Sequence, residues 1–354
     1  MSSSAGPSGF AVSCPVPLTT TDRVLLGHGS GGKMTADLIA RYFLPAFRNS
    51  YLDRLDDQAV LNVAGTRLAF TTDAHVVTPL FFPGGDIGML AVNGTVNDLA
   101  MAGARPLYLS AAFILEEGFP FAALRWIVES MSAAAKTAGV LVVTGDTKVV
   151  DRGKADGCFI TTSGVGILAH DQEITAAGAR PGDLVILSGA IAEHGMTIMA
   201  ARADLEVESP VVSDSTPLHE MVLDMLETGG EIHCLRDPTR GGVATALNEI
   251  ARQSGVGMVL EEDAILVREP VRGICELLGF DPLYVANEGK LLAIVEPRSA
   301  DRVLAAMGRR AEGRDARVIG EVVDDPDRLV VLKTRVRGRR IVDVLQGDQL
   351  PRIC

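Results

Sequence analysis

The apolar positions of this sequence fall into strand-like and helix-like segments that alternate along the chain. Helical spacing is clearest over residues 86–102 and 121–138, and short apolar or alternating runs predict strands. The predicted strands are 67–72, 141–144, 158–168, 184–188, 257–260, 290–295, 318–323 and 328–332, and the further helices are 218–228, 242–253, 271–278 and 299–307. Both halves are therefore predicted to be α+β units and not strict βαβ repeats.

The pattern breaks once, in a Gly- and Pro-containing turn over 174–183, and restarts with the strand at 184–188. A chain of 354 residues is too long for one typical core, which favours two domains. We place a first domain at 22–172 and a second at 173–345. Residues 1–21, rich in Ser, Gly, Pro and Thr, are predicted to be a disordered leader, and 346–354 a flexible tail.

Charge and cysteine content exclude several classes of partner. The net charge of −12 argues against nucleic acid and against an anionic membrane surface. No apolar run reaches the roughly 18 residues of a membrane span, and the leader lacks the features of a signal peptide. The five cysteines are scattered without Cys-x-x-Cys spacing, which disfavours a disulfide framework or a zinc cluster. A cytoplasmic protein is expected.

A glycine-rich segment, Gly27-His28-Gly29-Ser30-Gly31-Gly32-Lys33, follows the apolar run 24–26, predicted to be strand-like, and precedes a helical pattern. Bare backbone amides in such a loop can fold over phosphates. The segment nearly matches a P-loop. However, Met34 stands where a P-loop has the Ser or Thr that holds magnesium, so the ordinary P-loop mechanism does not apply. A plain flexible turn is the alternative.

Carboxylates recur in short motifs at predicted element ends. They stand at Asp56-Asp57, Asp73, Asn97-Asp98, Asp146 and Asp237. Hard divalent cations bound to phosphates take oxygen ligands of this kind. Taken singly, each could be a cap or turn residue. Asp98 is the exception, because it lies in an apolar helical pattern where an uncompensated carboxylate is costly.

The last residue of the sequence is a cysteine. Cys354 follows an apolar, strand-like run at 341–345 and the polar residues 346–349. A thiol there is poorly placed for core packing and well placed to reach another protein's active site. An incidental residue is the alternative.

Together these motifs resemble the HypE family of hydrogenase maturation factors, within the ATP-binding superfamily of aminoimidazole ribonucleotide synthetase and selenophosphate synthetase. The resemblance runs from about Arg23 to Cys354. It rests on the segments 27–33, 71–77, 81–88, 94–101, 144–150, 192–195, 237–242 and 351–354. The internal segments are shared across the superfamily, whereas the final Pro-Arg-Ile-Cys is specific to HypE.

The resemblance implies a homodimer that pairs through the sheets of its first domains, each a β-sheet or half-barrel with helices, and a second domain that is an α/β sandwich. It also implies ATP and Mg²⁺ as cofactors. The partner HypF would load a carbamoyl group onto Cys354. ATP would then drive dehydration of the thiocarbamate to a thiocyanate, and the cyano group would pass to iron in the HypC-HypD complex for assembly of the NiFe centre.

The resemblance also assigns residues. The candidate metal ligands are Asp57, Asp73, Asp98 and Asp237. The candidate ATP-binding residues are Gly29, Gly31, Gly32, Lys33, Thr72, Asp73, Asn97, Asp98, Asp146, Thr147 and Arg240. The candidate catalytic residues are Cys354 as the carrier, Lys148 and Glu288 as proton acceptors, His75 for orienting phosphate and Arg352 for offsetting charge or docking the tail.

Two other functions stay open on the sequence. One is a superfamily member that phosphorylates a free small molecule, although such enzymes of the selenophosphate type carry a reactive Cys or selenocysteine near the glycine-rich loop, and this loop has none. The other is a non-catalytic carrier whose thiol is loaded and unloaded by other proteins. ATP turnover that depends on a carbamoylated Cys354 would separate them.

Overall fold

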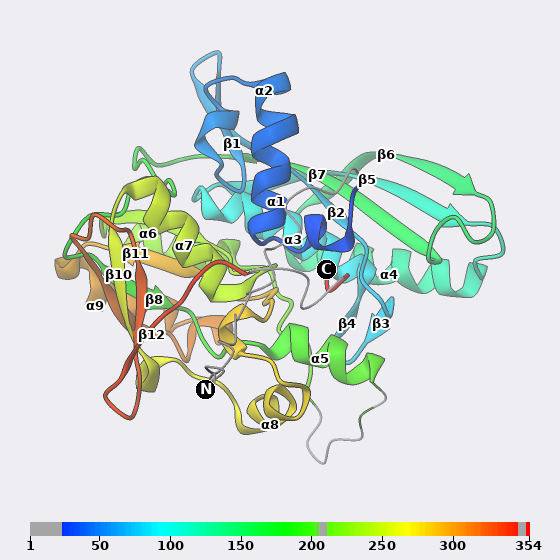
Figure 1. The fold of residues 1–354 in the computed structure, drawn as a ribbon. Helices are drawn as coiled ribbons and strands as arrows, with labels where there is room; N and C mark the ends of the chain where they lie inside the picture. Colours follow the sequence, from blue (N-terminus) through cyan, green and yellow to red (C-terminus); the bar gives the residue numbers. More distant parts are fainter. Residues whose placement is uncertain (1–22, 204, 206–210, 346–351) are drawn as a thin grey trace, which may run out of the picture.

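The computed structural model describes residues 23–203, 205, 211–345 and 352–354. The predicted leader and residues 346–351 of the predicted tail lie outside this part. The described chain forms two units, each with a mixed sheet and packed helices (Figure 1). No helix in the described ranges is long and apolar enough to cross a bilayer.

The first sheet has the strand order β1-β2-β7-β5-β6. In this sheet β5 and β6 pair in parallel and the other neighbouring strands are antiparallel. A parallel pair needs a long crossover connection, which a helix provides here. The strands are β1 (Ala59–Val63), β2 (Thr66–His75), β5 (Arg105–Glu116), β6 (Leu141–Val150) and β7 (Cys158–Ile167). A short hairpin, β3 (Phe81–Phe82) and β4 (Gly85–Asp86), stands beside this sheet.

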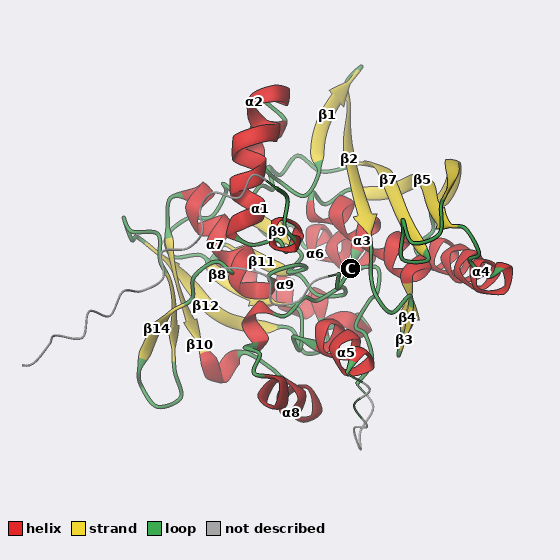
Figure 2. Ribbon diagram, turned by 45° about the vertical axis from the view of Figure 1, so that its right-hand side comes forward, coloured by secondary structure: helices red, strands yellow, loops and turns green. Residues whose placement is uncertain are grey.

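Two helices cover one face of this sheet (Figure 2). Helix α3 (Ile87–Met101) is apolar nearly all round and packs on β2, β5 and β7, and α4 (Phe121–Thr137) packs on α3 and β6. A helix with this composition is stable only when surrounded. Asp86 caps α3 by accepting hydrogen bonds from the amides of Gly88 and Met89, which fixes its first turn.

The other face of the first sheet carries an uncovered apolar row. Strand register places Phe70, Val165, Tyr108 and Leu141 side by side across β2, β7, β5 and β6. Phe70 is 43% exposed, Tyr108 48% and Leu141 63%. An apolar row of this extent on an antiparallel-type sheet is typical of a protein interface.

The second sheet has the order β14-β13-β10-β12-β8-β11-β9. Its strands are β8 (Leu184–Leu187), β9 (Ile232–Arg236), β10 (Gly257–Glu261), β11 (Leu292–Val295), β12 (Arg317–Val323), β13 (Val330–Lys333) and β14 (Arg339–Ile341). Its helices are α5 (Glu193–Arg202), α6 (His219–Glu227), α7 (Gly242–Ser254), α8 (Glu269–Leu278) and α9 (Ala300–Met307).

Helices lie on both faces of this second sheet. Along β11, Leu292 and Ile294 join the core formed with α5, α7 and α8, whereas Ala293 and Val295 join the core formed with α6 and α9. All four residues are fully buried, which explains why the strand is a continuous apolar run. The second domain is thus a three-layered sandwich with a closed core.

Two predicted strands are wrong. Residues 24–26 do not form a strand, because Leu26 begins a 3₁₀ helix, η1 (Leu26–Gly29), and no strand of the described ranges pairs with them. The predicted strand-like run 341–345 is only the end of β14, which stops at Ile341. After the glycine-rich loop the helical pattern is confirmed as α1 (Lys33–Leu38), a π-helical turn η2 (Ile39–Phe43) and α2 (Leu44–Phe47).

Candidate active site

Cys354 and the two residues before it lie in a seat between the two domains. The amide of Val76 donates to the backbone oxygen of Cys354 at 3.0 Å, and the amide of Thr78 donates to the Arg352 carbonyl at 3.2 Å. The Ile353 side chain is 1% exposed, within the main core. The end of the chain therefore pairs with the segment that follows β2.

His194, near the start of α5, fixes the middle of this tripeptide. Its Nε2 donates to the Ile353 carbonyl at 2.8 Å, and its Nδ1 lies 2.8 Å from the hydroxyl of Ser213. Burial lowers the pKa of His194, so the ring is neutral, with Nε2 protonated and Nδ1 accepting from the hydroxyl. Phe82 packs edge-on against the ring.

The thiol of Cys354 faces charged groups from both domains. Burial raises the pKa of this thiol strongly; Arg240 opposes the shift, while Glu288, Asp73 and Asp237 add to it. The thiolate is the nucleophilic form of cysteine. In its seat, Cys354 is consequently a neutral, weakly nucleophilic thiol.

Asp73 and His75 form a pair at the end of β2. Asp73 Oδ2 lies 3.2 Å from His75 Nε2, and the His75 side chain is 1% exposed. Burial would raise the pKa of Asp73, but His75 and then Arg240 reverse this and hold it well below its usual range. Gly94 on α3 permits the close approach, because a Cβ there would lie 3.0 Å from His75 Nε2.

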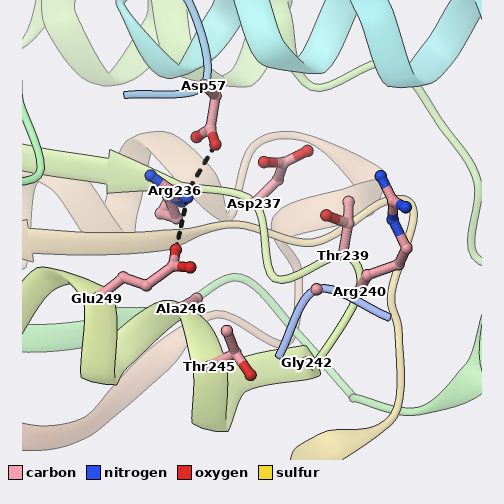
Figure 3. A pocket seen from close by; sticks show the side chains of 10 residues that line it. Asp57, Arg236, Asp237, Thr239, Arg240, Gly242, Thr245, Ala246 and Glu249 are labelled. Carbon is pink, nitrogen blue, oxygen red and sulfur yellow. Dashed lines mark hydrogen bonds and ion pairs between the residues drawn. The ribbon is translucent and has the colours of Figure 1, made fainter. Parts of the chain in front are cut away.

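Two further carboxylates of the predicted set, Asp57 and Asp237, line a cavity of about 140 Å³ together with Arg240 and Gly31, among others (Figure 3). Burial raises the pKa of Asp57, of Asp237 and of Asp98 on α3, and repulsion by Asp237 adds to the shift at Asp57 and Asp98. Burial raises the pKa of Asp237 to about 6, with Arg236 opposing the shift and Asp73 adding to it. Arg236 offsets part of the charge through its Nε, 3.1 Å from Asp57 Oδ1. The site holds more negative charge than its own cations balance.

These carboxylates are not gathered around one point. Among the described residues no group of three His, Cys, Asp or Glu side chains is arranged to hold a metal ion. Asp57 is turned toward Arg236, and Asp98 accepts from the Thr71 hydroxyl at 2.8 Å. Nevertheless, buried carboxylates with raised pKa values are the oxygen donors that Mg²⁺ takes, and Mg²⁺ commonly uses only one or two of them together with phosphate oxygens. The donor set fits this ion.

The glycine-rich loop closes over the same cavity. Arg240 Nη1 donates to the Gly29 carbonyl at 2.8 Å, and the Lys33 amide donates to the Leu345 carbonyl at 3.0 Å. Gly31 has a φ of +77°, and a Cβ there would lie 2.7 Å from the Cβ of Arg240. Glycine is required because the loop backbone must turn left-handed against the arginine.

Asn97 connects Glu288 to the first domain. Its Nδ2 donates to the carbonyls of Glu288 and Thr216 at 3.2 and 3.1 Å, and its Oδ1 accepts from the Leu218 amide at 2.8 Å. These bonds occupy the whole side chain of Asn97, so in this structure it positions Glu288. Burial raises the pKa of Glu288, and Asp73 and Asp237 add to the shift.

Other predicted residues lie away from this cluster. Asp146, Thr147 and Lys148 lie on β6, at the opposite edge of the sheet from Asp73, and the Lys148 ammonium pairs with Asp146 at 2.7 Å. Register places Lys148 beside Ile114, and Ile114 beside Phe159. The side chains of Asp146 and Lys148 are 61% and 70% exposed. Thr72, on β2, is exposed and donates to the Thr162 carbonyl.

The described chain therefore brings together part of the predicted set. The cluster around the thiol and the cavity contains Asp57, Asp73, His75, Asp98, Asp237, Arg240, Glu288 and Cys354. Sequence reasoning missed Arg236, Asp156 and Arg202, and it gave His194 no role. The signal for two of them was present, because Arg236 precedes Asp237 and His194 stands in the segment 192–195.

Comparison with protein families identifies both domains. Residues 55–168 match the N-terminal domain of AIR synthase related proteins, and residues 180–333 match the C-terminal domain. The two sheets and the shared cavity described above are thus those of an AIR synthase related protein.

Individual relatives show to which family of AIR synthase related proteins the chain belongs. The carbamoyl dehydratase HypE of Cupriavidus necator is 57% identical over 94% of this chain and 95% of its own. A crystal structure of a HypE–HypF complex matches with a TM-score of 0.83 at 48% identity, covering 87% of this chain and 99% of the other. HypE in complex with ATP matches with a TM-score of 0.80 at 47% identity, covering 94% and 100%. The chain belongs to the HypE family.

Proposed function

We propose that this protein is an ATP-dependent carbamoyl dehydratase that converts a carbamoyl group carried on Cys354 into a thiocyanate for hydrogenase maturation. The observation that carries this proposal is the seat of Cys354, whose thiol lies among Arg240, Glu288, Asp73 and Asp237 beside the cavity under the glycine-rich loop. Relatives named carbamoyl dehydratase HypE and a relative solved with ATP support it.

The reaction needs the carbamoyl oxygen to become a leaving group. That oxygen attacks the γ-phosphorus of ATP, the bond to the β-phosphate oxygen breaks, and ADP leaves. Loss of one N–H proton and then of the other, with cleavage of the C–O bond, leaves the nitrile on sulfur and releases phosphate. The products are the thiocyanate, ADP and phosphate.

Glu288 is our candidate for accepting these protons. It is 4% exposed, its Oε1 has no hydrogen-bond partner among the described residues, and its pKa is raised by burial and by neighbouring carboxylates. A raised pKa makes a carboxylate a stronger base than usual. Asn97 donates from α3 to the backbone carbonyl of Glu288 and therefore fixes Glu288 relative to the first domain.

The neighbouring polar groups would bind the nucleotide. Arg240 and the backbone of Gly29, Gly31 and Gly32 would contact phosphate oxygens. Mg²⁺, held by Asp57, Asp98 and Asp237 with Asp73 nearby, would offset the charge of the phosphates. In the free protein the surplus of carboxylates raises their pKa values, and a cation would remove that cost.

We further propose that two copies pair through the open face of the first sheet, across the row of Phe70, Val165, Tyr108 and Leu141. Lys148, Asp146 and Thr144 lie on this same exposed face, so a second copy would change their surroundings. A role for Lys148 in the reaction would therefore depend on the dimer. HypF is the proposed donor of the carbamoyl group, and the HypC-HypD complex its acceptor as cyanide.

The dimer is tested with Leu141→Asp, which places a charge on the most exposed residue named in the proposed contact row. We expect the mass in solution, measured by light scattering, to fall from dimer to monomer. Leu277→Asp is the matched control, because Leu277 is 69% exposed on α8, in the other domain. Dimeric Leu141→Asp protein, or a monomeric wild type, would contradict this interface.

The activity is tested by intact mass after incubation with HypF, carbamoyl phosphate and ATP. The wild type should gain one carbamoyl group and then lose one water only when ATP can be hydrolysed. Cys354→Ala should bind ATP and gain nothing, whereas Cys275→Ala, which removes a buried thiol, should behave as the wild type. ATP turnover independent of carbamoylation would favour a small-molecule kinase, and carbamoylation without dehydration a passive carrier.

A further inference from the structure

The seat of the tail has two kinds of contact. The backbone oxygens of residues 352, 353 and 354 each accept a hydrogen bond from the body of the protein. These bonds would form with any sequence. Side-chain contacts come from Ile353, which is buried, and from Arg352, which lies at the rim and is 31% exposed.

Arg352 is anchored at several points. Its Nε donates to the Val76 carbonyl at 3.1 Å, its Nη1 forms an ion pair with Asp156, and its guanidinium lies 5.9 Å from the centre of the Phe159 ring. Arg202 on α5 donates to the Arg352 carbonyl and to the Thr78 carbonyl. A planar guanidinium suits a site that combines ring stacking with a carboxylate.

Asp156 joins the tail to the segment that follows β2. It stands in the turn between β6 and β7, and it accepts from the Thr78 hydroxyl at 3.1 Å as well as from Arg352. Thr78 in turn bonds the Arg352 carbonyl through its amide. One half-exposed carboxylate therefore holds both sides of the seat. Nothing in the chemistry of dehydration requires it, because its contacts are with Arg352 and Thr78 and not with the thiol.

We propose that Asp156 is a positioning residue whose ion pair with Arg352 sets the fraction of time that Cys354 spends in its seat. The inference rests on the proposed function, in which a second protein must load the thiol. Ile353 is buried when seated, so loading requires release of the tail. A pair exposed at the rim contributes modestly, about two- to fivefold in an equilibrium, which suits a contact that must break in every cycle.

The test measures access to the thiol in the full-length protein, without any partner. Iodoacetamide alkylation of Cys354, followed by peptide mass, should be about two- to fivefold faster in Asp156→Asn than in the wild type. Asp151→Asn is the matched control, because Asp151 is an exposed aspartate in the same turn. Added salt should speed alkylation of the wild type toward the rate of Asp156→Asn and leave the variant unchanged.

A second variant controls for the possibility that Asp156→Asn alters the β6–β7 turn itself. Arg352→Gln removes the same ion pair from the side of the tail, together with the bond to the Val76 carbonyl and the contact with the Phe159 ring, and should give at least the same increase. Adding Asp156→Asn to Arg352→Gln should give little further increase, because the ion pair is already absent. Equal alkylation rates in the wild type and both single variants would overturn the proposal.

The same variants separate this inference from the proposed function. Asp156→Asn should be loaded by HypF faster than the wild type, and should dehydrate the loaded group more slowly in a single turnover. Faster alkylation in a protein that HypF never loads would support the positioning role and refute the dehydratase function. Unchanged alkylation with normal loading and dehydration would refute the positioning role and support the dehydratase function.

Discussion

The seat of the tail and the carboxylate side of the cavity differ in whether their polar and charged groups find partners within the chain. In the seat of the tail, His194, Arg202, Asp156 and the amides of Val76 and Thr78 all have partners within the chain. Across the thiol, the carboxylates of Asp57, Asp98 and Asp237 repel one another.

The difference shows that the chain itself supplies the contacts for the tail but not those that would balance the buried carboxylates. The tail is held in position by the chain itself, whereas the carboxylate side is destabilised by the burial and mutual repulsion of its charges. Residues held under such strain are typical of ligand sites, where the bound ligand restores the balance. Three predictions test this contrast.

The largest effect is expected from Glu288→Gln, on the carboxylate side. Loss of a proton acceptor should slow dehydration by about 10²- to 10⁴-fold, as is typical for general bases. Loading of Cys354 should be unaffected, because the tail leaves its seat beside Glu288 to be loaded. Single-turnover mass measurements follow both steps. Glu276→Gln, on α8, is the control, and dehydration at the wild-type rate in Glu288→Gln would exclude Glu288 as the base.

The next effect is on stability. The pKa of Asp237 is raised to about 6 by burial, opposed by Arg236. A carboxyl whose folded pKa exceeds its usual value of about 3.9 contributes fully below pH 4, and this contribution is lost as pH rises through 6. Asp237→Asn should therefore raise the free energy of unfolding of the nucleotide-free protein by up to about 3 kcal/mol at pH 7.5, and hardly at pH 4.

Urea unfolding at both pH values measures this, with Asp327→Asn as an exposed control. The same substitution should weaken binding of ATP with Mg²⁺, because it removes a ligand. Lower stability of Asp237→Asn at pH 7.5 would mean that the carboxylate is balanced within the chain, and the contrast between the seat of the tail and the carboxylate side would fail.

The smallest effect is expected from alanine substitutions at Gly31 and Gly65, which together distinguish backbone strain from a clash with Arg240. Gly31 and Gly65 have φ values of +77° and +83°, but only Gly31 would place a Cβ against another residue. Alanine at either position should cost about 1–2 kcal/mol of stability. Only Gly31→Ala should also weaken ATP binding, by about tenfold for a further 1.4 kcal/mol. Calorimetric titration checks this, and equal affinities in both variants would contradict a role for the loop in covering ATP.

Local pattern was enough to predict the long helices and the buried strands. The predicted helices 86–102 and 121–138 correspond to α3 and α4, since apolar spacing and a cap at Asp86 define them locally. β5 was missed because Ala111 and Ala112 interrupt its apolar signal. The run 24–26 was predicted as a strand because apolar residues alone do not reveal that no partner strand is present.

The site divides in the same way. Asp73, Asp98, Asp237 and Arg240 could be predicted because they stand in motifs of a known family. The seat of the tail could not, because it joins Arg352 to Asp156 and Val76 across some two hundred residues or more of sequence. Such pairs depend on how two sheets meet, which local periodicity does not encode.

The anchor at Leu345 has a kinetic consequence. Its carbonyl accepts a hydrogen bond from the Lys33 amide of the glycine-rich loop, and Arg352 is seven residues further along, a reach of at most about 25 Å. A thiol on so short a tether is presented to the site at an effective concentration of the order of millimolar or more. Dehydration is then first order in loaded protein, with no Michaelis constant for the carbamoyl group, and its rate does not change when the protein is diluted.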